Sequence, residues 1–366
     1  MYEIDSPIVA DLFCGASGLG LGARLAGFSV KASVDSDRIL TSSHSLNFSD
    51  GKLELGDVTN LKGPNLIRLA GGRLDGIIGG PPCQGFSEVG KADPKDPRRD
   101  LLRHFFRVVA ESRPRFFMME NVRGLMFAKN RPMLDQALEQ VPSFYKIIGP
   151  VRLDAAEFGA ATSRPRVFVL GYDPSSVDNF DESDVLAARR PATTVHEAIS
   201  DLQLAESGGE DSNGFDVWRF SGGRQQISSY AARLRSADNV TTGHRRTPHK
   251  AEVAKRFAAV PQGGMDKVGR HPRLAWSGQC PTLRAGTGAD LGSFQAVRPL
   301  HPEEPRVITV REAARLQGFP DGFRFHPTVW HSFRMIGNSV SPVVAEAILS
   351  VVRKRMAKQT TIEAAE

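Results

Sequence analysis

The sequence is poor in cysteine, since its 366 residues include only Cys14, Cys83 and Cys280, which lie far apart. Three widely spaced cysteines form neither a disulfide framework nor a zinc cluster, so we expect a reducing, cytoplasmic setting and no metal site. No uninterrupted apolar run approaches the roughly 18 residues typical of a membrane span. The first residues, MYEIDSPIVADLF, have no basic segment of the kind that begins a secretory signal.

The composition is that of an ordinary globular protein with a basic balance. Hydrophobic residues make up 40% and charged residues 24% of the chain, which is enough for a sizeable core. A length of 366 residues favours two domains. The net charge of +6 and the isoelectric point near 9.3 favour a polyanionic partner, because Lys and Arg displace counterions from phosphates.

Apolar segments alternate with helical stretches through the first half of the chain. This alternation is typical of an α/β fold with a Rossmann-like, mostly parallel sheet covered by helices. After Tyr172 the sequence becomes irregular, which predicts a second domain of short elements and long loops over residues 173–305. The predicted strands are residues 7–14, 30–34, 74–79, 115–119 and 167–172, and the clearest helices are 101–112 and 132–140.

Helix starts are well marked in the C-terminal half. Thr194 with Glu197, and Thr309 with Glu312, have the spacing of capping boxes, which predicts a helix after each threonine. Pro342 suits the first turn of a final helix.

A glycine-rich turn, CGASGLGLG, follows the first predicted strand. Backbone N–H groups at such a turn form a site for an anion or a cofactor. Gly18, Gly20 and Ala23 match the literal dinucleotide-binding pattern, and Asp35 or Asp37 lies where an acid would bind ribose. The pattern alone fits NAD, S-adenosylmethionine, or a tight turn without a ligand.

The stretch GGPPCQGFS places Cys83 in a stiff and unusual turn. Two prolines fix the backbone, and the glycines allow a ligand to approach closely. The turn follows a predicted strand, at the sheet edge where α/β proteins bind ligands. Cys83 is therefore a candidate nucleophile, although a free cysteine is more commonly a small buried hydrophobe.

Polar residues also follow the next predicted strands. Glu120 and Asn121 come directly after an apolar strand, where a carboxyl near a thiol is a candidate proton donor. Arg164 and Arg166 are spaced to place both side chains on one face of an extended segment. Each feature also fits a solvated or phosphate-binding charge, but together they favour an active site at the sheet edge.

Two basic stretches, residues 91–107 and 244–256, indicate where a polyanion would bind. Clusters of Lys and Arg are typical of phosphate contacts. For Arg103 and Arg107 an ordinary solvated helix is the simpler interpretation.

Six segments in one order resemble the DNA (cytosine-5) methyltransferase family, and together they span nearly the whole chain. PPCQGFS with ENV is highly specific. The resemblance implies a class I methyltransferase fold, with a catalytic domain over residues 1–172, a target-recognition domain over 173–305 and a return to the catalytic domain over 306–366. The segments are DLFCGASGLGLG, GGPPCQGFS, ENVRG, SRPRVFVLG, REAARLQGFPD and IGNSVSP.

The resemblance implies a covalent mechanism. Cys83 would add to C6 of cytosine, which makes C5 reactive towards the methyl group of S-adenosylmethionine. Glu120 would bind the exocyclic amino group and N3, and donating a proton there requires a raised carboxyl pKa, which a dry site can supply. Arg166 would bind the O2 edge and orient Glu120, while Arg164 would support it or contact phosphate. A base then removes the C5 proton, and elimination frees Cys83.

The resemblance also assigns cofactor and DNA contacts. The target base is stacked in a duplex, so it must be flipped out, and the basic segment 91–107 would close over the DNA. The implied cofactor residues are Phe13, Gly15, Gly18 and Leu19, Asp35 for the ribose, Asp57 for the adenine, and Pro81, Asn338 and Ser339. The implied DNA contacts are Gln84, Ser87, Arg98, Arg99, Arg245 and Arg246.

One pair of residues departs from the family pattern. The family often has a proline and a glutamine just before the arginines, where this chain has Ala161 and Thr162. Because the arginines are present, we expect the departure to affect local hydrogen bonding rather than activity.

Three other functions each fit part of the sequence. A tRNA cytosine methyltransferase shares the motifs, but the long region 173–305 favours DNA. An NAD-dependent oxidoreductase would leave the cysteine turn without a role, and a protein that only binds would not need Cys83, Glu120 and Arg166 intact. We expect a monomeric bacterial enzyme on double-stranded DNA in the cytoplasm, with any cognate restriction endonuclease encoded separately.

Overall fold

The computed structural model describes residues 6–82, 100–220, 227–285 and 297–356. These residues form two compact units. The first unit comprises residues 1–154, 165–189 and 344–366, and the second comprises 155–164 and 190–343. The second unit thus includes residues 306–343, and the functional division predicted from the sequence stays a prediction.

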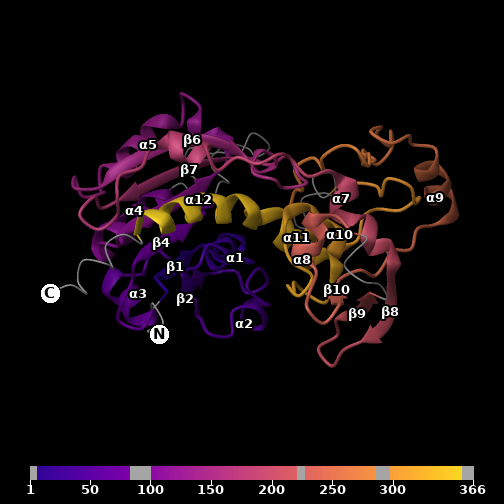
Figure 1. Cartoon of the computed structure of the whole chain (residues 1–366), viewed down its shortest axis with the longest axis horizontal. Coiled ribbons are helices and arrows are strands. Elements are labelled where there is room, and N and C mark those ends of the chain that lie inside the picture. Colours follow the sequence, from indigo (N-terminus) through magenta and orange to yellow (C-terminus); the bar gives the residue numbers. More distant parts are fainter. Residues whose placement is uncertain (1–5, 83–99, 221–226, 286–296, 357–366) are drawn as a thin grey trace. The chain divides into compact units, whose positions relative to one another are not determined.

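The first unit is built on a seven-stranded sheet with the strand order β3-β2-β1-β4-β5-β7-β6. Figure 1 labels β1, β2, β4, β6 and β7 of this sheet. Strands β1 to β5 run parallel, and β7 is antiparallel to both β5 and β6. This mixed, mostly parallel sheet confirms the predicted α/β fold class. The strands are β1 (Ile8–Leu12), β2 (Ser29–Asp35), β3 (Lys52–Leu55), β4 (Gly76–Gly79), β5 (Phe116–Asn121), β6 (Lys146–Asp154) and β7 (Pro165–Tyr172).

The central strands are buried because their sequences are continuously apolar, as expected for parallel strands covered on both faces. Every residue of β4 and β5 is buried. Two aromatic rings lie over glycines of neighbouring strands, where a Cβ on Gly76 would come 2.3 Å from the ring of Phe116, and one on Gly171 would come 2.2 Å from Phe117. Only glycine leaves room for these rings.

The helices of the first unit supply the rest of its core. Phe105 and Phe106 of α4 are buried and pack edge-on against Phe117 of β5. The main core therefore forms between α4 and the middle of the sheet. The helices are α1 (Gly18–Leu25), α2 (His44–Asn47), α3 (Gly63–Leu69), α4 (Leu101–Ser112), α5 (Arg131–Leu138), α6 (Glu182–Leu186) and, from residue 344 onward, α12 (Pro342–Met356).

The second unit combines a small antiparallel sheet with short helices, as the irregular sequence predicted. Its strands are β8 (Ala205–Glu210), β9 (Asp216–Phe220) and β10 (Val240–Thr242), in the order β10-β9-β8. Its helices are α7 (Val195–Ile199), α8 (Ser229–Leu234), α9 (Ala251–Ala258), α10 (Val310–Gln317) and α11 (Val329–Asn338).

Both predicted capping boxes are present in the second unit. The Thr194 hydroxyl accepts the N–H of Glu197, and the Glu197 carboxylate accepts the N–H of Thr194. Thr309 and Glu312 make the same exchange at the start of α10. Helix α7 ends at Ile199, and the chain continues from it as a 3₁₀ helix, Ser200–Leu204.

Among the described residues, the stretch Val329–Met356 is long and apolar enough to cross a membrane. However, 78% of its most apolar window is buried inside the protein, which is typical of a core helix. Polar residues such as Asn338 and Glu346 interrupt it, so it is not a continuous apolar run.

Candidate active site

Strands β2 and β3 lie on one side of β1 in the sheet, and β4 and β5 lie on the other side. The direction in which the chain adds strands thus reverses between β1 and β4, near the middle of the sheet. The loops after these two strands therefore leave in opposite directions, and α/β proteins bind ligands in the crevice at such a point. The glycine turn follows β1, and the segment that begins with Pro81 follows β4. Both predicted ligand-binding turns thus begin at the reversal point.

The glycine turn has three residues in the left-handed backbone region. Phe13, Gly15 and Ser17 have φ angles of 56°, 51° and 56°. This conformation is uncommon for residues other than glycine, so hydrogen bonds must hold the turn. The N–H of Gly15 donates to Asp35 Oδ2 at 2.8 Å, which ties the turn to the end of β2. Helix α1 begins directly afterwards at Gly18.

Two carboxyl groups lie in or beside this turn. Asp11 of β1 is fully buried, and burial raises its pKa to about 8. Burial also raises the pKa of Asp35. Helix α1 passes so close that a Cβ on Gly20 would lie 2.9 Å from Asp11 Oδ2. A cation bound here would stabilise both carboxylates, whereas an anion would not. The sequence interpretation overlooked Asp11, although an acid at the end of a buried strand is a recognisable signal.

The remaining cofactor residues predicted in the first unit also lie near strand ends. Asp57 is exposed after β3 and accepts the N–H of Thr59 at 2.9 Å. Leu19 is buried in the first turn of α1. Pro81 is held by Asn121, whose side-chain amide donates to the Pro81 carbonyl oxygen at 3.1 Å.

Glu120 and Arg166 form an ion pair at the carboxyl end of β5. Glu120 is 8% exposed, and its Oε1 lies 2.9 Å from Arg166 Nε. Arg166 comes from the start of β7, which meets the end of β5 because the two strands are antiparallel. Arg166 Nη1 also donates to the Pro165 carbonyl oxygen at 2.8 Å. A Cβ on Gly80 would lie 3.0 Å from Glu120 Oε2, so glycine lets the segment after β4 pass close to the carboxylate.

Arg164 belongs to the second unit, unlike Arg166. It is 3% exposed, and its guanidinium donates to the carbonyl oxygens of Leu283 at 3.0 Å and Gly337 at 2.7 Å. Such contacts are typical of an arginine that holds loops together. The assignment of Arg164 as a catalytic residue stays a prediction.

The two residues that depart from the family pattern are hydrogen-bonded to the segment around Cys280. Thr162 Oγ1 donates to the Cys280 carbonyl oxygen at 3.0 Å, and the Cys280 N–H donates to the Ala161 carbonyl oxygen at 2.8 Å. Burial raises the pKa of the Cys280 thiol, and it raises that of Cys14 as well. Neither of these two buried cysteines is therefore a thiolate at neutral pH.

Asn338 and Ser339 lie at the end of α11 in the second unit. Asn338 is exposed, whereas Ser339 is buried and its hydroxyl donates to the Met335 carbonyl oxygen at 2.8 Å. Their contact with the cofactor stays a prediction.

The two predicted DNA-binding arginines that the structure describes are both paired with acids. Arg245 Nη2 lies 2.7 Å from Glu210, and Arg246 Nη1 lies 3.2 Å from Glu304. Both arginines are exposed, so these pairs are weak and can be exchanged for phosphates. The predicted nucleophile Cys83 and the predicted contacts Gln84, Ser87, Arg98 and Arg99 lie outside the described residues.

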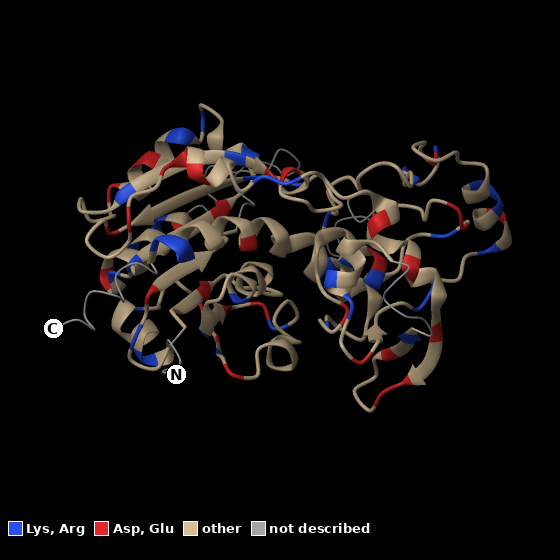
Figure 2. Cartoon of the chain, in the orientation of Figure 1, with Lys and Arg blue, Asp and Glu red and all other residues tan. Residues whose placement is uncertain are grey.

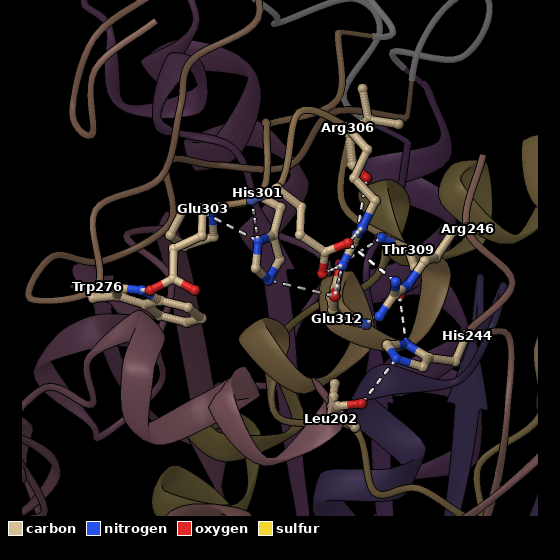
Figure 3. A network of polar contacts seen from close by, with 12 residues as sticks. Leu202, His244, Arg246, Trp276, His301, Glu303, Arg306, Thr309 and Glu312 are labelled. Carbon is tan, nitrogen blue, oxygen red and sulfur yellow. Dashed lines mark hydrogen bonds and ion pairs between the residues drawn. The ribbon is translucent and has the colours of Figure 1, made fainter. Parts of the chain in front are cut away.

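A buried ion-pair network surrounds the start of α10 (Figure 3). Arg306 donates to both carboxylate oxygens of Glu312, at 2.8 and 2.9 Å. Burial alone would raise the pKa of Glu312, but these bonds and the charge of Arg306 outweigh it and lower the pKa to about 2. His244 Nδ1 lies 3.0 Å from Thr309 Oγ1, and burial lowers the pKa of this histidine. The sequence predicted the cap of α10 but gave no sign of its arginine and histidine partners.

Helix α10 is charged in sequence yet buried on every side. Arg311 donates to three backbone carbonyl oxygens. Arg315 is fully buried, with Asp321 Oδ2 at 2.6 Å and Asp201 Oδ1 at 3.2 Å. The REAARLQ segment therefore holds the second unit together.

Comparisons with known proteins identify the family. Residues 8–354 match the model of the C-5 cytosine-specific DNA methylase family. The chain belongs to this family. It is 40% identical over 377 residues to the Type II methyltransferase M.XorII of Xanthomonas oryzae pv. oryzae. This alignment covers 96% of this chain and 86% of that protein. It is 30% identical over 383 residues to M.DdeI of Desulfomicrobium norvegicum, and this alignment covers 93% of this chain and 87% of that protein.

Solved structures agree with the family match. A prophage-encoded E. coli protein, described as a candidate DNA modification methyltransferase, superposes with a TM-score of 0.81 at 37% identity, covering 96% of this chain and 99% of that one. The Dnmt2 methyltransferase of S. pombe superposes with a TM-score of 0.63 at 16% identity, covering 96% of this chain and 99% of that one. At this identity the likeness shows a shared fold alone. The seven-stranded sheet is thus the class I methyltransferase fold.

The protein is a DNA cytosine-5 methyltransferase, and its reaction requires a methyl donor. Membership of this family excludes the NAD-dependent oxidoreductase that the glycine pattern suggested. Nothing in these likenesses favours the tRNA alternative.

Proposed function

We propose that this DNA cytosine-5 methyltransferase takes its methyl group from S-adenosylmethionine and delivers it to a cytosine flipped out of a specific short duplex sequence. The observation that carries the proposal is the 2.9 Å pair of Glu120 and Arg166. This pair lies beside the glycine–proline segment that leads from β4 to Cys83. Cys83 follows this segment in the sequence, and a nucleophile, a carboxyl and a guanidinium are the groups that methylation of cytosine C5 needs.

The groups around the glycine turn fit S-adenosylmethionine better than a dinucleotide. S-adenosylmethionine carries positive charge on its sulfonium and ammonium groups, whereas NAD carries an anionic pyrophosphate. The raised pKa values of Asp11 and Asp35 mean that both acids gain from a nearby cation and lose from an anion. When bound, the cofactor supplies an electrophilic methyl group. Asp35 would hold its ribose and Asp57 its adenine.

Further cofactor contacts would come from the turn itself. The backbone at Gly15 and Gly18 is positioned by the Asp35 hydrogen bond and by the start of α1. Phe13 and Leu19 would supply apolar contacts to the methionine part. Pro81, fixed by Asn121, would border the site from β4.

The protein groups would activate the base in sequence. Cys83 forms a bond to cytosine C6, which moves electron density to C5. Glu120 holds the exocyclic amino group and N3 and delivers a proton to N3. Arg166 holds Glu120 through Nε and approaches the O2 edge of the base. After methyl transfer, a base takes the C5 proton, the Cys83–C6 bond breaks to restore the thiolate, and N3 returns its proton to the Glu120 carboxylate.

The biological setting follows from the relatives. The Type II methyltransferases M.XorII and M.DdeI each match this chain over nearly its full length, which supports a role in restriction–modification. We propose a monomeric enzyme that works on double-stranded DNA in the bacterial cytoplasm, beside any separately encoded endonuclease.

Bisulfite sequencing of plasmid DNA from cells that express the chain tests this function. Methylated cytosines in one short context, absent with Cys83→Ala, are the expected result. Such a result also gives the target sequence. An unmethylated plasmid despite folded, well-expressed protein would overturn the proposal, and tRNA would then be assayed.

A further inference from the structure

We infer that Asp11, a buried acid behind the glycine turn, lets the enzyme distinguish its methyl donor from the product by exchanging a proton with solvent. Asp11 loses its proton when the positively charged donor binds and regains it once the methyl group has left. It thus determines specificity through charge and takes no part in the bond-making steps. The inference rests on the proposed function, since it takes S-adenosylmethionine as the donor.

Asp11 has no partner for a negative charge in the described part of the chain. Its side chain in β1 is fully buried, and neither Oδ1 nor Oδ2 has a hydrogen-bond partner among these residues. The hydroxyl of Ser17, which is 1% exposed, is equally without one. An unpaired charge is costly to bury. Burial therefore raises the pKa of Asp11 to about 8, and the nearby Ser17 and Gly20 do not offset this rise.

The strands beside β1 do not compensate the charge of Asp11. Strand β2 adds a second acid, Asp35, whose charge raises the pKa of Asp11 further. The lysine of the same strand, Lys31, lies 3.1 Å from Asp50. Strand β4 consists of glycine and isoleucine alone. Burial and the two acids also raise the pKa of the Cys14 thiol, so the turn itself brings in no charge.

The helices near the turn are no better sources of positive charge. Helix α1 is largely uncharged, as its mostly tan ribbon in Figure 2 shows. Its one arginine, Arg24, pairs with Asp50. On α2, burial and Arg24 lower the pKa of His44 to about 4, so this histidine is neutral. Within the described residues, a cation that stabilises the Asp11 carboxylate therefore has to be a ligand.

Asp11 lies against the turn that the cofactor would occupy. Helix α1 begins at Gly18 and leaves no room for a Cβ on Gly20, which would come 2.9 Å from Asp11 Oδ2. The N–H of Gly15 donates to Asp35 at 2.8 Å, so the other end of the turn rests on the second acid. The glycine turn thus borders two carboxyl groups, and of these Asp11 is the one without a partner.

The donor and the product differ by one positive charge. S-adenosylmethionine carries a sulfonium and an ammonium against one carboxylate, whereas the product has a neutral thioether in place of the sulfonium. The protein interior screens charge less than water does, so a cation at the turn favours the ionised form of Asp11. The donor therefore drives the Asp11 proton into solvent more strongly than the product does. By reciprocity, an ionised Asp11 holds the donor more tightly than the product.

Isothermal titration calorimetry on the full-length protein without DNA tests this with two probes, S-adenosylmethionine and S-adenosylhomocysteine. Titrations in two buffers of different ionisation enthalpy give the number of protons released on binding. Near pH 8, wild type should release more protons than Asp11→Asn with the donor, and this difference should be smaller with the product. The preference for donor over product should rise by about threefold to tenfold more in wild type than in Asp11→Asn between about pH 6 and about pH 9. The ammonium group of the ligand also titrates, but equally for both proteins.

Asp75→Asn is the matched control. Asp75 is likewise buried in the first unit, but its carboxylate lies 3.1 Å from Arg73 and 3.6 Å from Arg115. Its replacement should leave the proton release as in wild type. Infrared difference spectra of wild type give a second readout that needs no variant. The carbonyl stretch of a protonated carboxyl should be weaker with the donor bound than with the product bound.

The outcomes separate the inference from the proposed function. Equal proton release by wild type and Asp11→Asn on donor binding would overturn the inference. If Asp11→Asn does not fold or does not bind the donor, an infrared band of equal strength with donor and product overturns it instead. Failure of S-adenosylmethionine to bind wild type would overturn the proposed cofactor.

Discussion

Arg166 of β7 pairs with Glu120 of the antiparallel strand β5, and Arg166 Nε lies 2.9 Å from Glu120 Oε1. Because β7 is antiparallel to β5, the first residues of β7 lie beside the last residues of β5. Residues separated by more than forty positions thus meet at one end of the sheet, and the direction of β7 makes the pair possible.

The Glu120–Arg166 pair should behave as a unit in catalysis. We expect Glu120→Gln to lower kcat by about 10²–10⁴, the usual contribution of a positioned acid. Arg166→Ala should cost a comparable factor, and the double variant should lose little more than the worse single one. Single-turnover methylation of the target duplex measures this. Arg152→Ala on β6, an exposed arginine, should keep wild-type rates. Additive losses in the double variant would contradict the coupling.

Cys83 should be the only cysteine that forms a bond to DNA. We expect a duplex with 5-fluorocytosine at the target base to trap a covalent complex on a denaturing gel, because fluorine cannot leave as the C5 proton does. Cys83→Ser should abolish both trapping and methyl transfer while DNA binding survives. Cys280→Ala should still trap DNA, since burial raises the pKa of that thiol. Trapping by Cys83→Ser would rule out the assignment.

Asp11 should make stability fall between acidic and mildly basic pH. A carboxyl with a pKa raised to about 8 keeps its proton in the folded state, while the unfolded chain loses it near pH 4. The folded state is therefore destabilised progressively as pH rises from about 4 to about 8. Asp11→Asn should melt higher than wild type at pH 8, by roughly 4 °C or more, and the difference should shrink towards pH 5. The exposed Asp57→Asn serves as the control, and a pH-independent difference would contradict the raised pKa.

Arg315 should be indispensable to the second unit. Replacing it with Met leaves the carboxylates of Asp201 and Asp321 buried without their shared partner, which we expect to cost about 3–5 kcal/mol of unfolding free energy. Arg324→Met removes a partly exposed pair with Asp211 and should cost at most about 1 kcal/mol. Urea unfolding compares the two variants. Equal losses would mean that burial of the Arg315 network adds nothing.

Local patterns in the sequence were enough to locate many elements. The apolar spacing of residues 101–112 predicted α4 with the bounds that the structure has. The capping boxes at Thr194 and Thr309 were visible because their bonds join residues three positions apart. Motifs likewise placed Glu120 and Arg166 together before any geometry was known.

Features that depend on distant partners were not predictable in the same way. Strand β6 was missed because most of its residues are exposed or half-buried and carry no continuous apolar run. The direction of β7 does not show in its composition. Arg164 and Arg166 look equivalent in SRPR, yet one binds the carbonyl oxygens of Leu283 and Gly337 and the other binds a carboxylate. The partners of Arg164 lie more than a hundred residues away in the sequence, and the partner of Arg166 lies more than forty away.

The order in which the chain is made has a consequence for the first unit. The chain passes between the two units four times, and the last described segment of the first unit, the part of α12 from residue 344 onward, follows the whole of the second unit. During synthesis on the ribosome, the seven strands emerge long before α12, whereas all residues of the second unit have emerged by position 343. The second unit can therefore finish folding first, while the first unit stays incomplete until α12 has been synthesised.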